Sequence, residues 1–390
     1  MTADEQQAMR AELLAELDEA EQFAKDSPFP GPDILEVTQA PSEALERVAV
    51  RRAAAQREAA VATAESPGDP TRELTYAQAV SEGLREEIER DERVFLIGED
   101  IGPVRERERL WEQFRERRVW QTPISEAGFV GLAAGAAAVG LRPVVEIMYC
   151  DFVTVCFDQI VNQAAKLRGM SGFTFDTPMV IKTPAGSGTR EGGHHSGSHE
   201  AWFMHAPGIK VIAPSTAYDA KGLIKSAIRD DGLVFFVQHR LLHRMCAGPV
   251  PEGEWLVPIG VADVKRPGAD ITVVAYSYAL QKALRAAEAL EGEISVEVLD
   301  PRTLVPLDLV TILESVSRTG RMLVVHDAPG RCGAGAEIVR RVTEAGFDLL
   351  QAPPRVLAGA DVSMPYSPPL EDACIPQPLD IVRVVREMCR

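Results

Sequence analysis

The chain has 390 residues, of which 46% are hydrophobic and 25% are charged, a composition typical of a soluble globular protein. Its length exceeds the roughly 250–300 residues that a single hydrophobic core usually organises, which predicts two folded domains and an extension. A net charge of -17 argues against nucleic acid as the main partner, because an acidic surface repels phosphate.

The N-terminal segment differs from the rest of the chain. It has apolar residues at helical spacing, then a stretch rich in proline, then a second region rich in Ala, Arg and Glu. The predicted elements are a helix carrying Met9, Leu13 and Leu17, a break over 26–33, a second helix over about 42–63 and a linker over 65–70.

From residue 74 onward, apolar strands alternate with helices. This order predicts an α/β fold, with a mostly parallel sheet covered by helices on both faces. The expected helices cover 76–90, 127–139, 151–168 and 217–229. The expected strands cover 93–100, 119–123, 142–149, 178–184, 209–215 and 233–239.

Residues 246–258 have the composition of a linker, and a second α/β unit follows them. Its expected strands cover 270–277, 295–303 and 322–329, and its expected helices cover 279–291, 308–316 and the residues after GAGAE. The C-terminal end is expected to be irregular before a last helix.

The six cysteines are scattered and include no CxxC pair, which is typical of a reducing cytoplasm. The acidic N-terminus lacks the basic and apolar regions of a signal peptide. No apolar run reaches the roughly 18 residues of a membrane span. We therefore expect a cytoplasmic protein that does not bind membranes.

Glu126 stands alone at the start of the small-residue segment EAGFVGLAAGAAA. A carboxylate at this place commonly caps a helix and interacts with its dipole. Alternatively, it lies in an apolar pocket, where burial suits a carboxyl group to proton transfer. The small residues behind it would let another backbone or a flat ligand approach closely. The residues alone leave both interpretations open.

The loop GSGTREGGHHSGSHEAWFMH contains four of the seven histidines. His195 and His199 are four residues apart, a spacing that could suit a metal on a helix. However, the loop is rich in glycine and offers no obvious third ligand, so we expect no zinc. A loop over an active site, with one histidine as an acid, base or oxyanion donor, fits better.

Five stretches together carry a resemblance to a known family: TPISEAGFVGLAAGAA, FDQIVNQAAKLRGMSG, HSGSHEAWFMHAPGIKVIAPSTAYDAKGLIKSAIRD, DPRTLVPLD and PYSPPLEDACIP. The chain resembles the β subunit of the thiamine-diphosphate-dependent first component of 2-oxo acid dehydrogenase complexes. Within that family, MYCDFVTVCFDQIVNQAAKLRGMSG and IKTPAGSG are most similar to the acetoin-dehydrogenase branch, and the branched-chain enzymes come next.

The resemblance implies a transketolase-like pyrimidine-binding domain over 73–247, followed by a transketolase C-terminal-type α/β domain over 248–390. It also implies an α2β2 heterotetramer with the cofactor at each α–β interface. The α subunit would hold the diphosphate and Mg²⁺, and this chain would hold the aminopyrimidine. The sequence contains no Gly-Asp-Gly motif, the usual grip on Mg²⁺ and the diphosphate, which agrees with this division.

The resemblance also assigns the site residues. Glu126 aligns with the glutamate that hydrogen-bonds N1′ of the aminopyrimidine and so promotes proton removal from the thiazolium. Phe152 aligns with the aromatic residue that stacks on the pyrimidine, and Ile124 and Met148 align with residues that pack around it. His195 aligns with an active-site histidine near the substrate and the incoming lipoyl group.

Two further assignments come from the same resemblance. His205 is a second candidate histidine. A potassium site of the family, made largely of backbone carbonyl groups, would include Met179, Ala227, Ile228, Asp230 and Gly232.

Two segments depart from the family pattern. The segment IGPVRERERLWEQF is shorter and more charged than its counterpart, which affects expected contacts with α. The N-terminal ELDEAEQFAKDSPFPGPDILEV is foreign to β subunits and resembles the C-terminal tail of the α subunit. We therefore expect residues 1–72 to be a helical extension that completes an α subunit. The alternative is an unrelated solvated helix.

The implied function is cleavage of a small 2-oxo acid, or an acyloin such as acetoin, with transfer of the fragment to a lipoyl acyltransferase. The alternative is a free-standing, transketolase-like carboligase that forms acyloins with an α subunit. A scaffold without catalysis is disfavoured because Glu126, Phe152 and His195 are all present.

Overall fold

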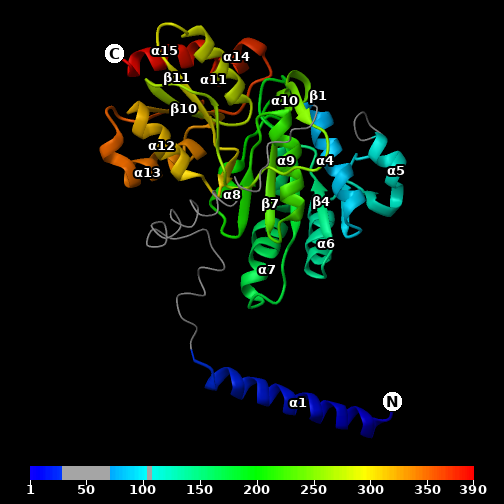
Figure 1. Ribbon diagram of the computed structural model, residues 1–390. Helices are drawn as coiled ribbons and strands as arrows, with labels where there is room; N and C mark the ends of the chain where they lie inside the picture. The colour runs from blue at the N-terminus through cyan, green and yellow to red at the C-terminus, as the bar shows by residue number, and fades with distance from the viewer. Residues whose placement is uncertain (29–70, 103–107) are drawn as a thin grey trace. The chain divides into compact units, whose positions relative to one another are not determined.

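The computed structural model describes residues 1–28, 71–102 and 108–390, shown as the coloured ribbon in Figure 1. The helix expected over 42–63 and the linker expected over 65–70 lie outside the described residues. Two units are distinguished by their internal contacts, and each is described by itself.

The N-terminal unit contains the single helix α1 (Ala3–Asp26) within its described residues, which confirms the helix predicted there. Thr2 and Glu5 form a capping box at its start. The Glu5 N–H donates to the Thr2 hydroxyl at 3.2 Å, and the Thr2 N–H donates to the Glu5 carboxylate at 2.6 Å. All side chains of α1 are exposed, including the apolar Leu13 and Leu17.

The first sheet of the larger unit has seven strands in the order β12-β6-β7-β5-β4-β2-β3. All neighbouring pairs are parallel except β12 with β6, which confirms the predicted mostly parallel sheet. The strands are β2 (Val94–Gly98), β3 (Val119–Gln121), β4 (Arg142–Glu146), β5 (Met179–Ala185), β6 (Ile209–Ile212), β7 (Leu233–His239) and β12 (Thr303–Val305).

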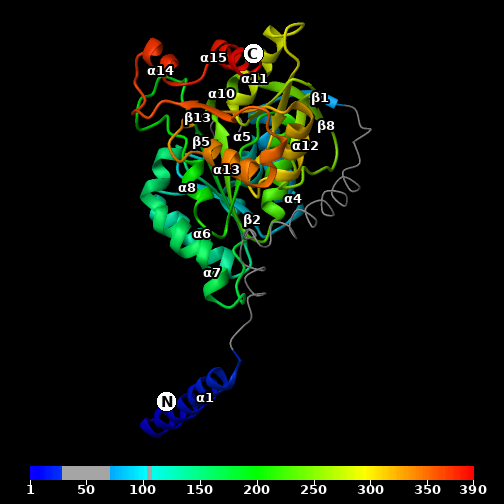
Figure 2. The same ribbon diagram turned by 90° about the vertical axis from the view of Figure 1, so that its left-hand side faces the viewer.

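Helices cover both faces of this sheet, and Figure 2 shows α6 and α8 on one side of β2 and α4 on the other. Successive strand residues alternate between two cores: Phe95 and Ile97 pack in one, and Val94 and Leu96 pack in the other. One face carries α4 (Tyr76–Arg90), α5 (Glu108–Arg118), α9 (Ala217–Arg229) and α10 (Arg240–Met245), and the other carries α6 (Glu126–Ala138), η3 (Cys150–Cys156), η4 (Gln159–Ala164), α7 (Ala165–Met170) and α8 (Glu200–Met204).

The second sheet has five strands in the order β14-β13-β10-β11-β9, all parallel to their neighbours except β9. Figure 1 shows α11 and α15 on one side of it and α12 and α13 on the other. The elements are β9 (Asp263–Arg266), β10 (Ile271–Ala275), β11 (Val296–Asp300), β13 (Met322–Pro329), β14 (Arg355–Gly359), α11 (Tyr278–Ala289), α12 (Leu309–Thr319), α13 (Ala334–Gly346), η5 (Phe347–Leu349), α14 (Pro368–Cys374) and α15 (Pro378–Met388).

The predicted helix over 151–168 is wrong in its form. The segment is a 3₁₀ turn (η3), a π-helical turn (η4) and only then the α-helix α7. Its buried residues explain the 3₁₀ part of the change, because the first three recur every three residues and the later ones every four: Cys150, Val153, Cys156, Ile160 and Ala164. A 3₁₀ helix has about three residues per turn, so it keeps the first three of these on the face toward the sheet.

The predicted linker 246–258 is also wrong in part, because it contains a strand. β8 (Ala247–Pro251) pairs in antiparallel order with β1 (Thr71–Thr75). The two ends of the first domain therefore form one two-stranded sheet.

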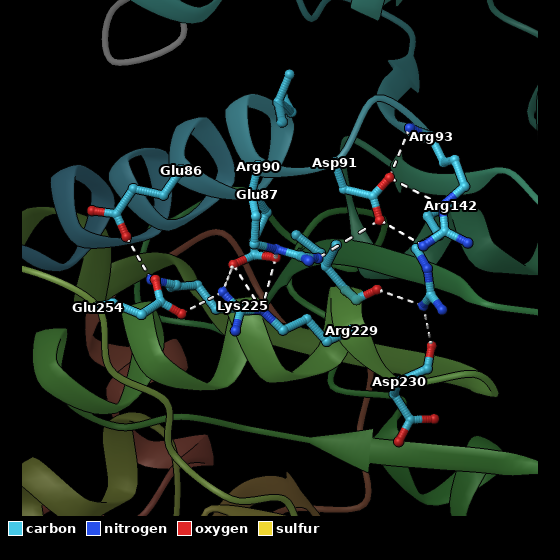
Figure 3. Close-up of polar contacts among 12 residues, drawn as sticks. Glu86, Glu87, Arg90, Asp91, Arg93, Arg142, Lys225, Arg229, Asp230 and Glu254 are labelled. Carbon is cyan, nitrogen blue, oxygen red and sulfur yellow. Dashed lines mark hydrogen bonds and ion pairs between the residues drawn. The ribbon is translucent and has the colours of Figure 1, made fainter. Parts of the chain in front are cut away.

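A buried ionic network joins α4 to α9, as Figure 3 shows. The Lys225 ammonium group is fully buried and lies 2.7 Å from the carboxylates of both Glu86 and Glu254. The Arg229 guanidinium donates to the Glu87 carboxylate at 3.0 Å. Buried charges are tolerated only when they are paired in this way. Glu254 lies in the connection after β8, so the network also fixes that connection.

The two sheets are linked by β12, which follows β11 of the second sheet but pairs with β6 of the first. Nearby, the Lys265 ammonium lies 2.6 Å from the Asp219 carboxylate, and the Arg302 guanidinium lies 2.7 Å from it. Because Asp219 belongs to α9 and the two cations belong to the C-terminal half, these ion pairs fix the two halves against each other. None of the helices in the described ranges is both long and apolar enough to cross a lipid bilayer.

Candidate functional site

The candidate site lies where the first sheet ends. β2, β3 and β4 are parallel, so their carboxyl ends meet at one edge, and α6 begins directly beyond β3. In open α/β sheets this edge is the usual place for a ligand. The segment between β3 and α6 continues the hydrogen bonding of the sheet, because the Thr122 N–H donates to the Gly98 carbonyl at 2.9 Å.

Glu126 is the first residue of α6 and only 6% exposed. Its carboxylate has no hydrogen-bond or ion-pair partner in the part of the chain that the structure describes, and no side chain caps the helix at Ser125. The simple capping interpretation therefore has no support. A buried carboxylate without a donor is costly unless a ligand supplies one.

A second carboxyl group, Glu99, lies close to Glu126 at the end of β2. It is 3% exposed, and one of its oxygens has no hydrogen bond. Burial raises the pKa of Glu99, and the negative charge of Glu126 raises it further. The same two causes raise the pKa of the Cys156 thiol in η3 to about 12. Sequence analysis missed Glu99, although its place after a buried strand is a signal for a site residue.

The side chain of Tyr149, directly before η3, packs against both Phe152 and His195, two of the predicted site residues. The ring of His195 packs edge-on against Tyr149 at 4.4 Å and against Phe152 at 5.5 Å between centroids. Phe152 and Met148 are half-buried, whereas Ile124 is 76% exposed. The structure thus brings Phe152 and His195 together, and Ile124 lies two residues before Glu126 with its side chain largely exposed.

The other histidines of the loop have different surroundings. His199 stacks on Trp202 at 4.0 Å, and its Nε2 lies 3.4 Å from the Asp151 carboxylate. Burial would raise the pKa of Asp151, but hydrogen bonds from His199 and the Gly197 backbone lower it below the ordinary value. His205 is exposed at the end of α8. Among the described residues, no group of three or more His, Cys, Asp or Glu has a metal-binding arrangement.

The loop that carries His195 is fixed from the C-terminal half of the chain. The Glu371 carboxylate is fully buried and accepts hydrogen bonds from the Gly188 N–H at 2.6 Å and the Arg190 N–H at 3.2 Å. The Arg190 guanidinium donates to the same carboxylate at 2.8 Å. A cavity of about 220 Å³ beside this contact is lined by ion-paired groups such as Arg190 and Lys282 and by apolar residues such as Leu241, and Glu126 is not part of its lining.

The residues predicted for potassium lie together where β5 begins and α9 ends. The Asp230 carboxylate accepts two 2.6 Å hydrogen bonds from Lys210. Arg142 donates to the carbonyl groups of Ile228 and Asp230 at 3.0 Å, and Figure 3 shows it beside Asp230. Two of the expected carbonyl oxygens and the carboxylate are therefore already bound by donors of the protein.

Both halves of the larger unit match known protein families. Residues 72–245 match the family described as transketolase, pyrimidine binding domain, and residues 260–381 match the transketolase C-terminal domain. Among solved structures, a split-gene transketolase, described as an inactive β4 tetramer, is similar with a TM-score of 0.66 and 21% identity, covering 81% of this chain and all of that one. At this identity the likeness shows the fold alone.

Curated proteins are similar at a much higher identity. The β subunit of 2-oxoisovalerate dehydrogenase from Bacillus subtilis is 40% identical over 81% of this chain and 98% of its own length. The β subunit of acetoin:2,6-dichlorophenolindophenol oxidoreductase from Cupriavidus necator is 40% identical over 81% and 97%. The β subunit of the pyruvate dehydrogenase E1 component from Rhizobium meliloti is 40% identical over 81% and 70%. The chain belongs to this family of 2-oxo acid and acetoin dehydrogenase β subunits.

Proposed function

We propose that the chain is the β half of a thiamine-diphosphate-dependent dehydrogenase whose substrate is a 2-oxo acid or an acyloin. The observation that carries the proposal is the buried carboxylate of Glu126, which has no partner among the described residues, in a chain of this family. The relatives named for three different substrates have the same 40% identity, so identity does not choose the substrate.

The residues at the edge of the sheet fit the pyrimidine half of the cofactor. An aminopyrimidine is flat and apolar on its faces, and its N1′ can share a proton with a carboxylate. Glu126 supplies that carboxylate in dry surroundings, and Phe152, Met148 and Ile124 supply apolar surface. When bound, thiamine diphosphate supplies the nucleophilic carbon that attacks the substrate carbonyl group. Glu126 would hold the proton at N1′, and His195 would lie on the side of the substrate.

The rest of the cofactor site belongs to an α partner in this proposal. The sequence lacks a Gly-Asp-Gly motif, so Mg²⁺ and the diphosphate would be held by α in an α2β2 heterotetramer. A lipoyl acyltransferase would receive the acyl group. Such an assembly in the cytoplasm is consistent with an acidic chain that has scattered, unpaired cysteines.

The N-terminal extension has its own proposed role. The curated relative from Bacillus subtilis is matched over 98% of its length by 81% of this chain, and the family match begins at residue 72. We propose that residues 1–72 serve as the missing tail of the α partner. The exposed apolar residues Met9, Leu13 and Leu17 of α1 would be covered by α.

The proposal also includes a potassium ion bound at the end of α9. Carbonyl oxygens have two lone pairs, so those already bound by Arg142 could also contact an ion. Replacing NaCl by KCl at equal concentration should raise the midpoint of thermal unfolding. An unchanged midpoint would mean that no potassium binds there and that Lys210 and Arg142 alone satisfy the Asp230 carboxylate and the carbonyl groups.

The function is tested by mixing the chain with its α partner, thiamine diphosphate and Mg²⁺. Turnover of pyruvate, branched-chain 2-oxo acids and acetoin is then measured, first with an artificial electron acceptor and then with a lipoyl acyltransferase. Acyl transfer to the lipoyl group supports the proposal. Formation of acyloins without any transfer would instead identify a carboligase, and the absence of cofactor-dependent turnover would contradict both functions.

A further inference from the structure

The loop from Gly186 to His199 has a shape that its own backbone does not determine. Four of its residues have positive φ angles: Gly186 (89°), Gly188 (99°), Arg190 (64°) and Gly192 (69°). Within the loop, few backbone hydrogen bonds help, such as the one from the Gly186 N–H to the Gly197 carbonyl at 2.9 Å. Side chains outside the loop must therefore select this conformation.

Among the described residues, three side chains outside the loop form hydrogen bonds with its backbone, and they hold different parts of it. Asp151 accepts from Gly197, and Glu371 accepts from Gly188. Neither has a hydrogen bond to His195 in the described part of the chain. Arg240, at the start of α10, donates to the His195 carbonyl at 3.1 Å, and this is the only side-chain hydrogen bond to His195 from the described residues.

Arg240 makes further contacts on both sides of His195. Its guanidinium donates to the Thr189 hydroxyl at 2.9 Å and forms an ion pair with Glu191. The same guanidinium lies over the ring of Tyr149, with its central carbon 4.8 Å from the ring centroid. Tyr149 in turn packs against the imidazole of His195. Glu191 faces Arg240, the Tyr149 hydroxyl and His195.

Through these contacts Arg240 connects the loop, the ring of Tyr149 and the imidazole of His195. An arginine can do this because its planar guanidinium offers five donors in fixed directions and also stacks on aromatic rings. The Arg240 side chain is only 14% exposed, so its contacts are little screened by water. Without it, the His195 carbonyl and the ring of Tyr149 would lose the contact that sets their relative position.

We propose that Arg240 is a positioning residue for the reaction, holding His195 and Tyr149 in the orientation that presents the imidazole to the substrate. The inference rests on the proposed function, because it assumes that His195 acts at the substrate. Arg240 itself touches the loop and the ring of Tyr149, so it acts through His195. Lysine would keep the positive charge but could not reach Thr189, Glu191 and the carbonyl group together.

The first test does not depend on activity. Amide hydrogen exchange is measured in the assembled α–β protein for wild type, Arg240→Gln and Arg244→Gln. Arg244 is the matched control, since it lies on the same short helix, is exposed and has no hydrogen bond or ion pair to the described residues. Arg240→Gln should speed exchange in residues 189–195 by about tenfold or more, with exchange in α6 unchanged. Unchanged exchange in the loop overturns the proposal.

The second test is a double-mutant cycle on turnover. Arg240→Gln should lower kcat by about 10–100-fold, because small misplacements of reacting groups cost this much. Arg240→Lys should recover only part of the loss, and the affinity for thiamine diphosphate should stay within about twofold. In a His195→Ala background, Arg240→Gln should change kcat little, because the group that it positions is gone. An equal loss in both backgrounds overturns the proposal.

The outcomes separate this inference from the proposed function. Wild-type assembly without cofactor-dependent turnover, or His195→Ala with full activity, contradicts the proposed function or the role of His195. In that case the exchange experiment still decides whether Arg240 orders the loop. Normal kcat in Arg240→Gln together with impaired His195→Ala contradicts the inference alone.

Discussion

The Glu371 carboxylate accepts a hydrogen bond from the Gly188 N–H at 2.6 Å, although 183 residues separate the two in sequence. Glu371 lies in α14 of the C-terminal half, and Gly188 lies in the loop that carries His195. The contact therefore makes the conformation of the candidate active-site loop depend on the position of the C-terminal domain. It also gives a structural reason for the motif PYSPPLED.

Glu371→Gln should destabilise the protein. Glutamine keeps one acceptor for Gly188 but places an amide donor against the donors of Arg190, so a buried group loses its partner. We expect the free energy of unfolding in urea to fall by about 2–3 kcal/mol. Asp372→Asn is the control, because this side chain is 51% exposed and its ion pair with Arg190 should contribute about 0–1 kcal/mol. A larger loss of unfolding free energy in Asp372→Asn than in Glu371→Gln would contradict the role given to Glu371.

Asp300 should make stability depend on pH near neutrality. Burial is the main cause that raises its pKa from 3.8 to about 7, the Lys265 ammonium opposes the rise, and Asp219 adds to it. The folded state therefore binds more protons than the unfolded state between these values. The free energy of unfolding contributed by Asp300 must then decrease as the pH rises through this window.

Asp300→Asn tests this dependence, because asparagine cannot ionise but can still accept the 2.8 Å hydrogen bond from the Arg302 N–H. Urea unfolding at pH 5 and pH 7 is compared for the two proteins. The variant should gain stability relative to wild type as the pH rises from 5 to 7. Parallel pH profiles for the two proteins would show that Asp300 does not titrate in this range.

Phe152→Ala should weaken binding of thiamine diphosphate to the α–β assembly. Loss of one aromatic contact is worth about 0.5–1.5 kcal/mol, which corresponds to a factor of about 2–10 in the dissociation constant. Val155→Ala is the matched control, since it is 57% exposed in the same 3₁₀ segment. Equal effects of the two substitutions, measured by calorimetry, would remove Phe152 from the cofactor site.

Charge placed on the exposed apolar residues of α1 should weaken assembly with α. Leu13→Glu and Leu17→Glu place charge on its exposed apolar residues without breaking the helix, because glutamate is a good helix former. We expect the dissociation constant for α, measured by analytical ultracentrifugation, to rise by about tenfold or more. Glu12→Gln is the control on the same exposed helix. Normal assembly of the leucine variants would support the alternative of an unrelated solvated helix.

Glu126→Gln should abolish turnover while leaving the fold and the assembly with α intact. Glutamine has nearly the same shape but cannot take or hold the proton, and general acid–base groups contribute about 10²–10⁴-fold. The measurement is kcat with an artificial electron acceptor, together with the mass of the assembly. Activity near the wild-type level would rule out the proposed role.

Strongly patterned elements could be predicted from the sequence. The helix 217–229 and the strand 233–239 have the same bounds in the structure as in the prediction. Their apolar residues face a sheet that is buried on both sides, so the pattern is strong. β9 (Asp263–Arg266) was missed because it is half-buried, charged and antiparallel at the edge of its sheet, where no apolar run marks it.

Parts of the site could not be predicted because they depend on contacts that are distant in sequence. Glu126 was singled out by its position before an apolar segment, and Phe152 and His195 by resemblance. Arg240 has no local signal, since its importance comes from a loop some 45–51 residues earlier in the chain. The π-helical turn at 159–164 has no signal in the apolar pattern, because its buried residues Ile160 and Ala164 keep the four-residue spacing of an ordinary helix.

The central claim is that this chain supplies only the pyrimidine half of a thiamine diphosphate site. Its most direct test is calorimetric titration of thiamine diphosphate with Mg²⁺ into the purified chain, and then into the chain assembled with its α partner. The account predicts no measurable binding to the chain alone and saturable binding to the assembly. Tight binding to the chain alone would contradict it, because the chain would then hold the diphosphate by itself.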